Sequence, residues 1–436
     1  MQDDIEGRAT RKIFWRLMPL LMLGSGFCNL DRANIGFASI RMNADLGLTA
    51  AQFGFAAGIF YLGYVLCCVP GILIGRKVGL RLWLPLVMLA WGTCSMATAL
   101  TTNAHQLSFV RLILGVAEAS YIPCALLLLA QWAPNNHRGR FTAWFWFAAS
   151  VATVAGAPIS GFILKFDEIS GLRSWHMLFI VEAAPVCLIG IIGYWLLPSD
   201  AANPSWLDAS ERHWLATQRL AQSDTPVRSA RTLVRELRNP SVTLLCLANF
   251  FIMSMGISFS FFFPPFLRSR GIDVVSIGIG VSLVHGVAAC ATVLWGRCSD
   301  HFAHNRQLVC CAAALVAAIA VLFLPFASGV MLIIFTGCMV QSGLNGAITT
   351  FWPLPMAAVG ARSAPAVLAS VTMFGNVAGL VGPYVTGVLR DRTDGYALSF
   401  AMLASCIAVA GLLVLLSRSV GSERGSAGTL LMGQSH

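Results

Sequence analysis

Long apolar runs separated by short polar loops dominate the chain. A membrane-spanning helix needs about 20 mainly apolar residues to cross a hydrocarbon core of roughly 30 Å. Twelve runs meet this requirement, and the longest polar stretch, 198–240, separates six of them from the other six. The runs lie near 14–38, 53–74, 81–101, 106–131, 140–164, 174–197, 242–265, 274–297, 307–326, 329–352, 364–388 and 396–417. The pattern predicts an all-α polytopic membrane protein with two six-helix bundles.

The polar stretches set the expected domain boundaries. We expect an N-terminal bundle over 1–197, a cytoplasmic central loop over 198–240 and a C-terminal bundle over 241–418. An acid-rich helical pattern follows Ser210, which predicts a short amphipathic surface helix inside the loop. The Gly- and Ser-rich residues 419–436 predict a disordered cytoplasmic tail.

Composition supports a membrane protein and excludes a nucleic-acid partner. Of the 436 residues, 57% are hydrophobic and only 11% are charged, whereas soluble domains carry about 25% charged residues. The net charge of +10 comes from basic residues concentrated in alternate loops, with no nucleic-acid-binding module. A basic surface facing anionic lipid explains that charge, and the lipid bilayer is therefore the expected partner.

The loop charges also predict orientation. Of the 29 Lys and Arg residues, three lie within spans and seven lie in one set of alternate loops. The rest lie in the two termini, the central loop and the other loops on the same side of the membrane. Loops rich in Lys and Arg stay on the cytoplasmic side. We expect a multi-pass protein of the cell (inner) membrane, a monomer with both termini cytoplasmic, whose first apolar run is retained rather than cleaved.

Three positions in the first half recur in the second half at one offset. Gly71 and Gly296 are 225 residues apart, as are Arg81 and Arg306, and the same offset separates two prolines, Pro158 and Pro383. Each pair occupies equivalent predicted spans or loops, so the halves look like a duplicated six-helix unit. Two such halves about an axis along the membrane normal describe the major facilitator arrangement.

Charged residues interrupt the apolar runs of the first half, and four of them are candidates for function. Asp31 and Arg32 lie in the first span, and Arg111 and Glu118 lie seven residues apart on one face of the fourth. A charge near the middle of a membrane helix costs roughly 2.5–3.5 kcal/mol, so it is typically functional. The guanidinium of Arg32 suits bidentate binding of a carboxylate. Two internal ion pairs holding the helices together are the structural alternative.

Several segments resemble the major facilitator superfamily, and within it the anion:cation symporter family. LDRANIGFA (30–38) and RLILGVAEASYIP (111–123) are similar to its first- and fourth-helix signatures. WAPNNHRGR (132–140) and WGRCSDHFAHNR (295–306) resemble its cytoplasmic loops. The segment 351–396 resembles the bacterial phthalate- and tartrate-type branch. The resemblance covers nearly the whole chain and leaves the individual substrate open.

The resemblance implies roles for particular residues. It implies proton coupling by Asp31 and Glu118, and substrate binding by Tyr64 in the second helix and Asn376 in the eleventh. Asn34, one turn from Asp31, is expected to line the same cavity. The predicted substrate-binding residues are Arg32, Arg111, Tyr64, Asn376, Asn34 and Trp352. Trp352 precedes Pro353, where we expect the tenth helix to break, and it forms either a cavity wall or a packing contact.

One departure from the family pattern concerns Gly75. The superfamily usually has an acid at this position in the loop between helices two and three, where it stabilises the outward-facing state. We expect its replacement by Gly75 to shift the conformational balance without removing the transport site.

The leading hypothesis is a proton-coupled symporter that imports a small organic anion, a carboxylate, by alternating access. Its partners are the anion and protons, and it needs no cofactor beyond the proton gradient. An exchanger or uniporter without proton coupling is the alternative, and a transporter-like sensor is a further one. The thirteen cysteines show no metal-ligand spacing, and neither a nucleophile–base pair nor a nucleotide-binding loop occurs, so we expect no metal and no enzyme activity.

Overall fold

The computed structural model describes residues 2–169, 171–198, 206–220, 239–359 and 363–432. Within these ranges it has 12 helices or helix pairs that are long and apolar enough to cross a membrane. The predicted fold class is confirmed, since each expected span corresponds to one of them. Helices suit the bilayer because every backbone N–H and C=O group then finds its partner within the same segment.

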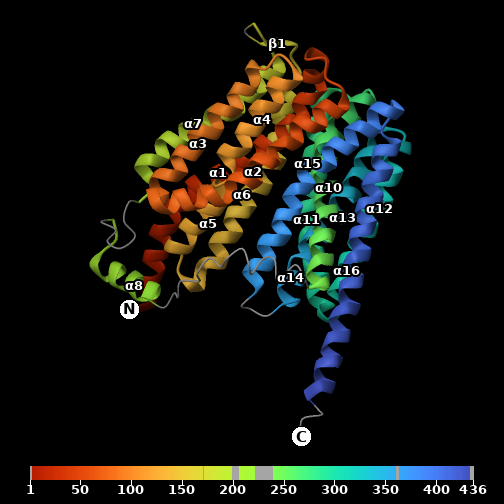
Figure 1. The fold of residues 1–436 in the computed structure, drawn as a ribbon. Coiled ribbons are helices and arrows are strands. Elements are labelled where there is room, and N and C mark those ends of the chain that lie inside the picture. The colour runs from red at the N-terminus through yellow and green to blue at the C-terminus, as the bar shows by residue number, and fades with distance from the viewer. Residues whose placement is uncertain (1, 170, 199–205, 221–238, 360–362, 433–436) are drawn as a thin grey trace. The chain divides into compact units, whose positions relative to one another are not determined.

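The first half of the chain contains six spans, drawn from red to yellow-green in Figure 1. Its helices are α1 (Gln2–Asp45), α2 (Ala50–Val78), α3 (Leu80–Ala97), α4 (Ala104–Glu118), α5 (Tyr121–Trp132), α6 (Arg138–Ile163), α7 (Ser174–Leu196) and α8 (Ala209–Leu220). Two short 3-10 helices, η1 (Thr98–Leu100) and η2 (Asn135–His137), follow α3 and α5. The predicted fourth span is divided into α4 and α5.

The second half supplies the other six spans. Its helices are α10 (Pro240–Ser269), α11 (Val274–His301), α12 (Arg306–Phe323), α13 (Val330–Phe351), α14 (Pro353–Ala357), α15 (Ala364–Thr393) and α16 (Ala397–Met432). Two 3-10 helices, η3 (Ala303–Asn305) and η4 (Leu324–Phe326), flank α12. The tenth span breaks at Trp352, between α13 and α14, which confirms the break predicted from the following prolines.

The chain forms two compact units, and the first two boundaries between them lie inside α1 and inside α2. Unit 1 comprises 1–42 and 62–226, and unit 2 comprises 43–61 and 227–436. The sequence predicts bundles over 1–197 and 241–418, whereas the first part of α2 clusters with the second half of the chain. α16 continues to Met432, beyond the bundle boundary predicted at residue 418. The disorder expected over 419–436 therefore stays a prediction.

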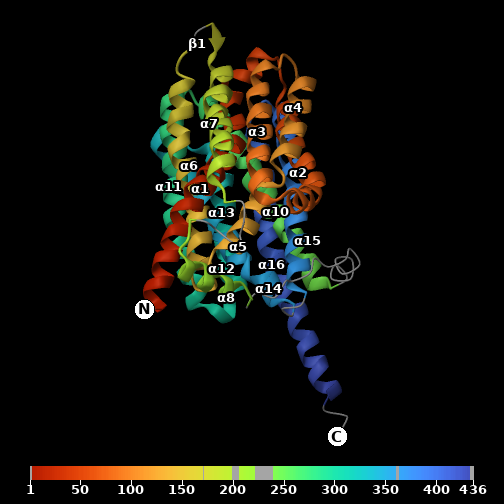
Figure 2. The same ribbon diagram turned by 90° about the vertical axis from the view of Figure 1, so that its left-hand side faces the viewer.

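A small β-hairpin joins α6 to α7 (Figure 2). Strand β1 (Glu168–Ile169) pairs antiparallel with β2 (Leu172–Arg173). Hydropathy does not predict this hairpin, because two-residue strands are too short to show an alternating pattern.

The duplicated positions fall in equivalent elements. Gly71 in α2 corresponds to Gly296 in α11, and Pro158 in α6 corresponds to Pro383 in α15. Arg81 and Arg306 both lie in the first turn of the third helix of their halves. The structure is thus consistent with a repeated six-helix pattern.

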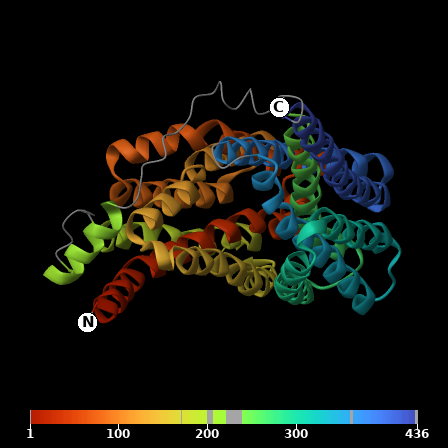
Figure 3. The same cartoon turned by 90° about the horizontal axis from the view of Figure 1, so that it is seen from below.

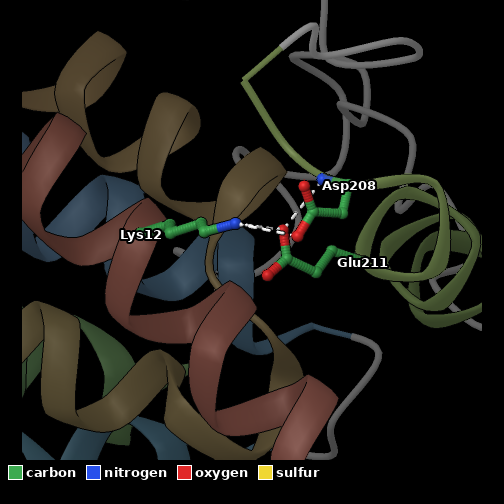
Figure 4. Close-up of polar contacts among 3 residues, drawn as sticks. All are labelled: Lys12, Asp208 and Glu211. Atoms are coloured by element: carbon green, nitrogen blue, oxygen red, sulfur yellow. Dashed lines mark hydrogen bonds and ion pairs between the residues drawn. The ribbon is translucent and has the colours of Figure 1, made fainter.

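The amphipathic helix predicted in the central loop is present as α8, and it docks on the start of α1 (Figure 4). Lys12 Nζ lies 2.8 Å from a carboxylate oxygen of Glu211, which is fully buried, and 3.2 Å from one of Asp208. The same Glu211 oxygen accepts a hydrogen bond from the Asp208 backbone N–H at 2.9 Å. This acid thereby both caps α8 and anchors it to α1. The arginines predicted beyond residue 220 in this loop lie outside the described residues.

Small residues bring α2 and α15 into close contact within unit 2. A Cβ atom at Gly58 would lie 2.8 Å from the Leu380 carbonyl oxygen and 3.0 Å from that of Gly379. At the start of α2, Asp391 accepts hydrogen bonds from the backbone N–H groups of Ala50 at 2.8 Å and Ala51 at 2.7 Å. An acid from one helix therefore caps the exposed N–H groups of the other.

Gly75 also occupies a crowded position, in this case within unit 1. A Cβ atom there would lie 2.5 Å from Trp83 Cδ1 and 3.1 Å from Cys124 Sγ. The Trp83 indole N–H donates to Ser120 Oγ at 3.0 Å, which fixes the ring against α2. Packing of α3 against α2 thus supplies a physical reason for glycine where the family pattern has an acid.

Candidate functional site

The centre of the candidate site is an ion pair between α1 and α4. Arg32 Nε donates to Glu118 Oε1 at 2.7 Å, and Arg32 Nη2 lies 2.5 Å from the same oxygen. Glu118 is fully buried, whereas 26% of the Arg32 side chain is exposed. The structure therefore brings together two of the charged residues predicted from the sequence, with the arginine as the accessible member.

Two further side chains complete the surroundings of this pair. Cys28, one turn before Arg32 on α1, donates its thiol hydrogen to Glu118 Oε1 at 3.1 Å. The guanidinium carbon of Arg32 lies 5.0 Å from the ring centroid of Tyr64, a cation–π distance. Tyr64 thus lies beside Arg32, and its role in substrate binding stays a prediction.

Glu118 keeps one carboxylate oxygen available. All three contacts to this carboxylate, from Arg32 and Cys28, use Oε1. Oε2 is buried and has no hydrogen-bond partner among the described residues. A buried polar atom without a hydrogen-bond partner costs free energy.

Asp31 points to a different neighbour from Arg32, although the two are adjacent in sequence. Its Oδ1 accepts a hydrogen bond from Ser95 on α3, and the carboxyl is 5% exposed. Arg111 on α4 is fully buried and interacts electrostatically with Asp31. The four predicted charged residues therefore form one cluster, buried except at Arg32, with α3 as an additional wall.

A third carboxyl extends the cluster. Glu182 on α7 accepts a hydrogen bond from Ser160 Oγ at 2.8 Å, and Asn34 lies near the same carboxyl. Asn34 itself is 1% exposed, so it joins the polar interior of unit 1. Its predicted place beside the substrate cavity stays a prediction.

The break between α4 and α5 lies directly after Glu118. Pro123 has no backbone N–H, so the carbonyl of Ala119 loses its usual helical partner. Ala119 and Ser120 separate the two helices. Glu118 consequently ends α4, and the chain changes geometry at the residue that carries the central carboxylate.

Trp352 and Asn376 belong to unit 2. Trp352 is half-buried, and its ring meets that of Phe351 edge-on at 6.1 Å between centroids. Asn376 is half-buried on α15. Both side chains retain exposed surface, and their predicted contacts with substrate stay predictions.

Sequence reasoning missed the uncharged partners of the cluster. Cys28, Ser95 and Ser160 each bind a buried carboxyl. Small polar residues are tolerated in membrane helices and do not disturb the hydropathy pattern. Only Cys28 carried a signal, since its i, i+4 spacing places it on the same helical face as Arg32.

This combination of twelve spans and a buried charged cluster is typical of membrane transport proteins. The sequence matches the family model of the Major Facilitator Superfamily over residues 21–383. The chain belongs to the Major Facilitator Superfamily.

Two curated relatives are similar over nearly the whole chain. One is a putative tartrate transporter of Agrobacterium vitis, 32% identical over 426 residues, which cover 98% of each chain. Another is the putative metabolite transport protein NicT of Pseudomonas putida, 31% identical over 93% of each chain. Both matches therefore extend over nearly the whole of each chain.

A solved structure shows the same fold at low sequence identity. The bacterial homologue of the human lysosomal transporter Spinster, in an inward-facing and unoccupied conformation, matches with a TM-score of 0.73 at 16% identity. The match covers 94% of this chain and 96% of that chain.

Proposed function

We propose that the protein is a proton-coupled symporter that imports a small organic anion with carboxylate groups across the cell inner membrane. The similarity to putative tartrate and metabolite transporters supports an organic substrate. The observation that carries the proposal is the Arg32–Glu118 pair, in which an accessible cation is held by a fully buried acid.

The pair provides a physical route to coupling. A substrate carboxylate and Glu118 compete for the same guanidinium, which binds carboxylates through parallel N–H donors. Protonation of Glu118 removes its charge and releases Arg32 for the substrate. Each event then favours the other, because a proton alone leaves Arg32 without an anion and an anion alone leaves Glu118 as an uncompensated buried charge.

The rest of the cluster is assigned supporting roles. Arg111 supplies a second buried positive charge, and Asp31 is the second candidate for proton coupling. Tyr64 offers a hydroxyl and a ring beside Arg32. Trp352 and Asn376, in unit 2, are proposed to bind the substrate during alternating access.

Transport into proteoliposomes tests this proposal. We expect purified protein to take up labelled tartrate or phthalate against a concentration gradient when the outside is acidic. A protonophore should abolish accumulation but leave exchange of internal for external anion. Uptake that reaches the same level with and without the pH gradient would support the uncoupled exchanger or uniporter instead.

A further inference from the structure

An apolar groove runs along one side of unit 1, between α1 and α6. Its volume is about 1090 Å³. Figure 3 shows the red ribbon of α1 in this unit beside the gold ribbon of α6. Its walls are almost entirely apolar, with aromatic residues at Phe14, Trp15, Phe141, Trp144 and Phe147.

The two helices run parallel, so the contacts between them show which residues of α1 and α6 lie at the same height along the groove. Near the start, the Phe14 ring lies 5.3 Å from the Phe141 ring. Further along, a Cβ atom at Gly26 would lie 3.0 Å from Ala152 Cβ. The lining extends from Gly7 to Leu30 on α1, roughly 35 Å at 1.5 Å per residue. The groove thus extends about the length of a membrane span.

Positive charge gathers at the starting end of the groove. Arg11 on α1 and Arg140 on α6 both line it and are exposed. Neither forms an ion pair with a residue that the structure describes. The N-terminus of α6, at Arg138, adds the positive end of a helix dipole. Glu6, an acid at this end, contacts His137, whose Nε2 lies 3.2 Å from Glu6 Oε1.

The exposed walls have no cover from unit 1 itself. Trp15 is 69% exposed and Phe147 is 55% exposed. Tryptophans near the end of membrane helices lie at the level of lipid headgroups, with the polar edge towards water. A ligand that fits this surface needs a long apolar body and an anionic end.

We propose that the groove between α1 and α6 is a binding site for one anionic glycerophospholipid. The headgroup phosphate binds Arg11 and Arg140, and an acyl chain lies along the groove towards Leu30. Basic pockets beside transmembrane helices favour anionic headgroups in this way. The site lies away from the Arg32–Glu118 pair, neither residue of which lines the groove.

Native mass spectrometry of the purified full-length protein tests the proposal. Protein is released from nanodiscs made of equal parts phosphatidylglycerol and phosphatidylcholine. We expect one phosphatidylglycerol to be retained, at about tenfold preference over phosphatidylcholine. The double variant Arg11→Gln/Arg140→Gln should remove most of that preference. The matched control Arg76→Gln/Lys77→Gln removes equal charge from the exposed last turn of α2 and should keep it.

A second pair of variants tests the apolar part and remains informative if the charge variant fails to fold. Ala155→Trp fills the groove from α6 and should abolish retention of the lipid, whereas Ala90→Trp, on the exposed face of α3, should not. Equal retention by wild type, Ala155→Trp and the arginine double variant would overturn the proposal.

Competition separates the lipid from other anions. Inorganic phosphate at millimolar concentration should not displace phosphatidylglycerol, because it lacks the apolar chain. Displacement by phosphate, tartrate or phthalate would identify the groove as a site for soluble anions and contradict the lipid assignment. Lipid retention is measured without transport, so its failure and the failure of the symport proposal are distinguishable.

Discussion

At the scale of single residues, the account depends on two side chains that share one contact. Arg32 is the accessible cation and Glu118 is the buried acid that holds it. Removing Arg32 leaves the Glu118 charge buried without a partner, and breaking a buried pair in this way costs about 3–5 kcal/mol. Variants that keep shape or charge are therefore more informative than alanine substitutions.

Glu118→Gln should uncouple proton movement from anion movement. Glutamine keeps the shape of the side chain but cannot take up a proton, and it no longer neutralises Arg32. We expect pH-driven accumulation to be lost while exchange of labelled for unlabelled anion is partly retained. If this variant still concentrates substrate under a pH gradient, the coupling role belongs to another acid, with Asp31 the next candidate.

Arg32→Lys should lower anion uptake at least tenfold although it keeps the positive charge. Lysine lacks the planar fork that binds a carboxylate through two N–H donors. Uptake rate at saturating and limiting anion concentrations measures the effect. Arg41→Lys on the same helix is the control, since Arg41 binds the Leu164 carbonyl and Asp167. Equal uptake by both variants would contradict a role for the Arg32 guanidinium in binding.

The sequence predicts the charged residues of the site better than its neutral ones. Asp31, Arg32, Arg111 and Glu118 stand out because ionic groups are expensive in a membrane helix. Ser95 and Ser160 cannot be singled out from hydropathy because hydroxyls in membrane helices often bond the preceding turn, as Ser160 also does. The pairing of Arg32 with Glu118 required tertiary contacts as well.

At the scale of elements, close packing of α2 against α15 is the feature most open to test. The contact uses glycines on both helices, so the two backbones lie too close together to admit an added methyl group between them. Spans are predictable from hydropathy, and the break at Trp352 is predictable from the two prolines that follow. The division of α2 between the two units is not predictable from hydropathy, because it depends on these tertiary contacts.

Gly58→Ala should destabilise unit 2. The added methyl would lie 2.8 Å from the Leu380 carbonyl oxygen, and such overpacking costs about 1–3 kcal/mol. We expect a fall of several degrees in the melting temperature of the purified protein in detergent. Gly286→Ala on α11 is the matched control, because nothing lies within 4 Å of its added Cβ. An equal melting temperature for the two variants would mean that the contact between α2 and α15 accepts the added methyl group without loss of stability.

Asp391→Asn should loosen the start of α2. The carboxylate accepts hydrogen bonds from two adjacent N–H groups, and its charge faces the positive end of the helix dipole. Loss of such a cap costs about 0.5–2 kcal/mol. Faster amide hydrogen exchange at Ala50 and Ala51 should report it, with Asp394→Asn, just beyond the end of α15, as the control. Unchanged exchange would show that the cap contributes little.

At the scale of the whole molecule, the repeat in the sequence and the family match describe the same architecture. The 225-residue offset aligns Gly71 with Gly296 and Pro158 with Pro383, in equivalent helices. The four charged residues that define the site all fall in unit 1. Under the proposed alternating access, unit 1 carries the ion pair, and Asn376 of unit 2 is the expected substrate contact from the second half.

The most direct test of the central claim is proton entry driven by the anion alone. Proteoliposomes at equal internal and external pH, with a trapped pH indicator, receive external tartrate or phthalate under a clamped membrane potential. We predict acidification of the interior in step with anion uptake, and none in Glu118→Gln vesicles that still exchange anion. Anion entry by the wild-type protein without any change of internal pH would contradict the proposed coupling.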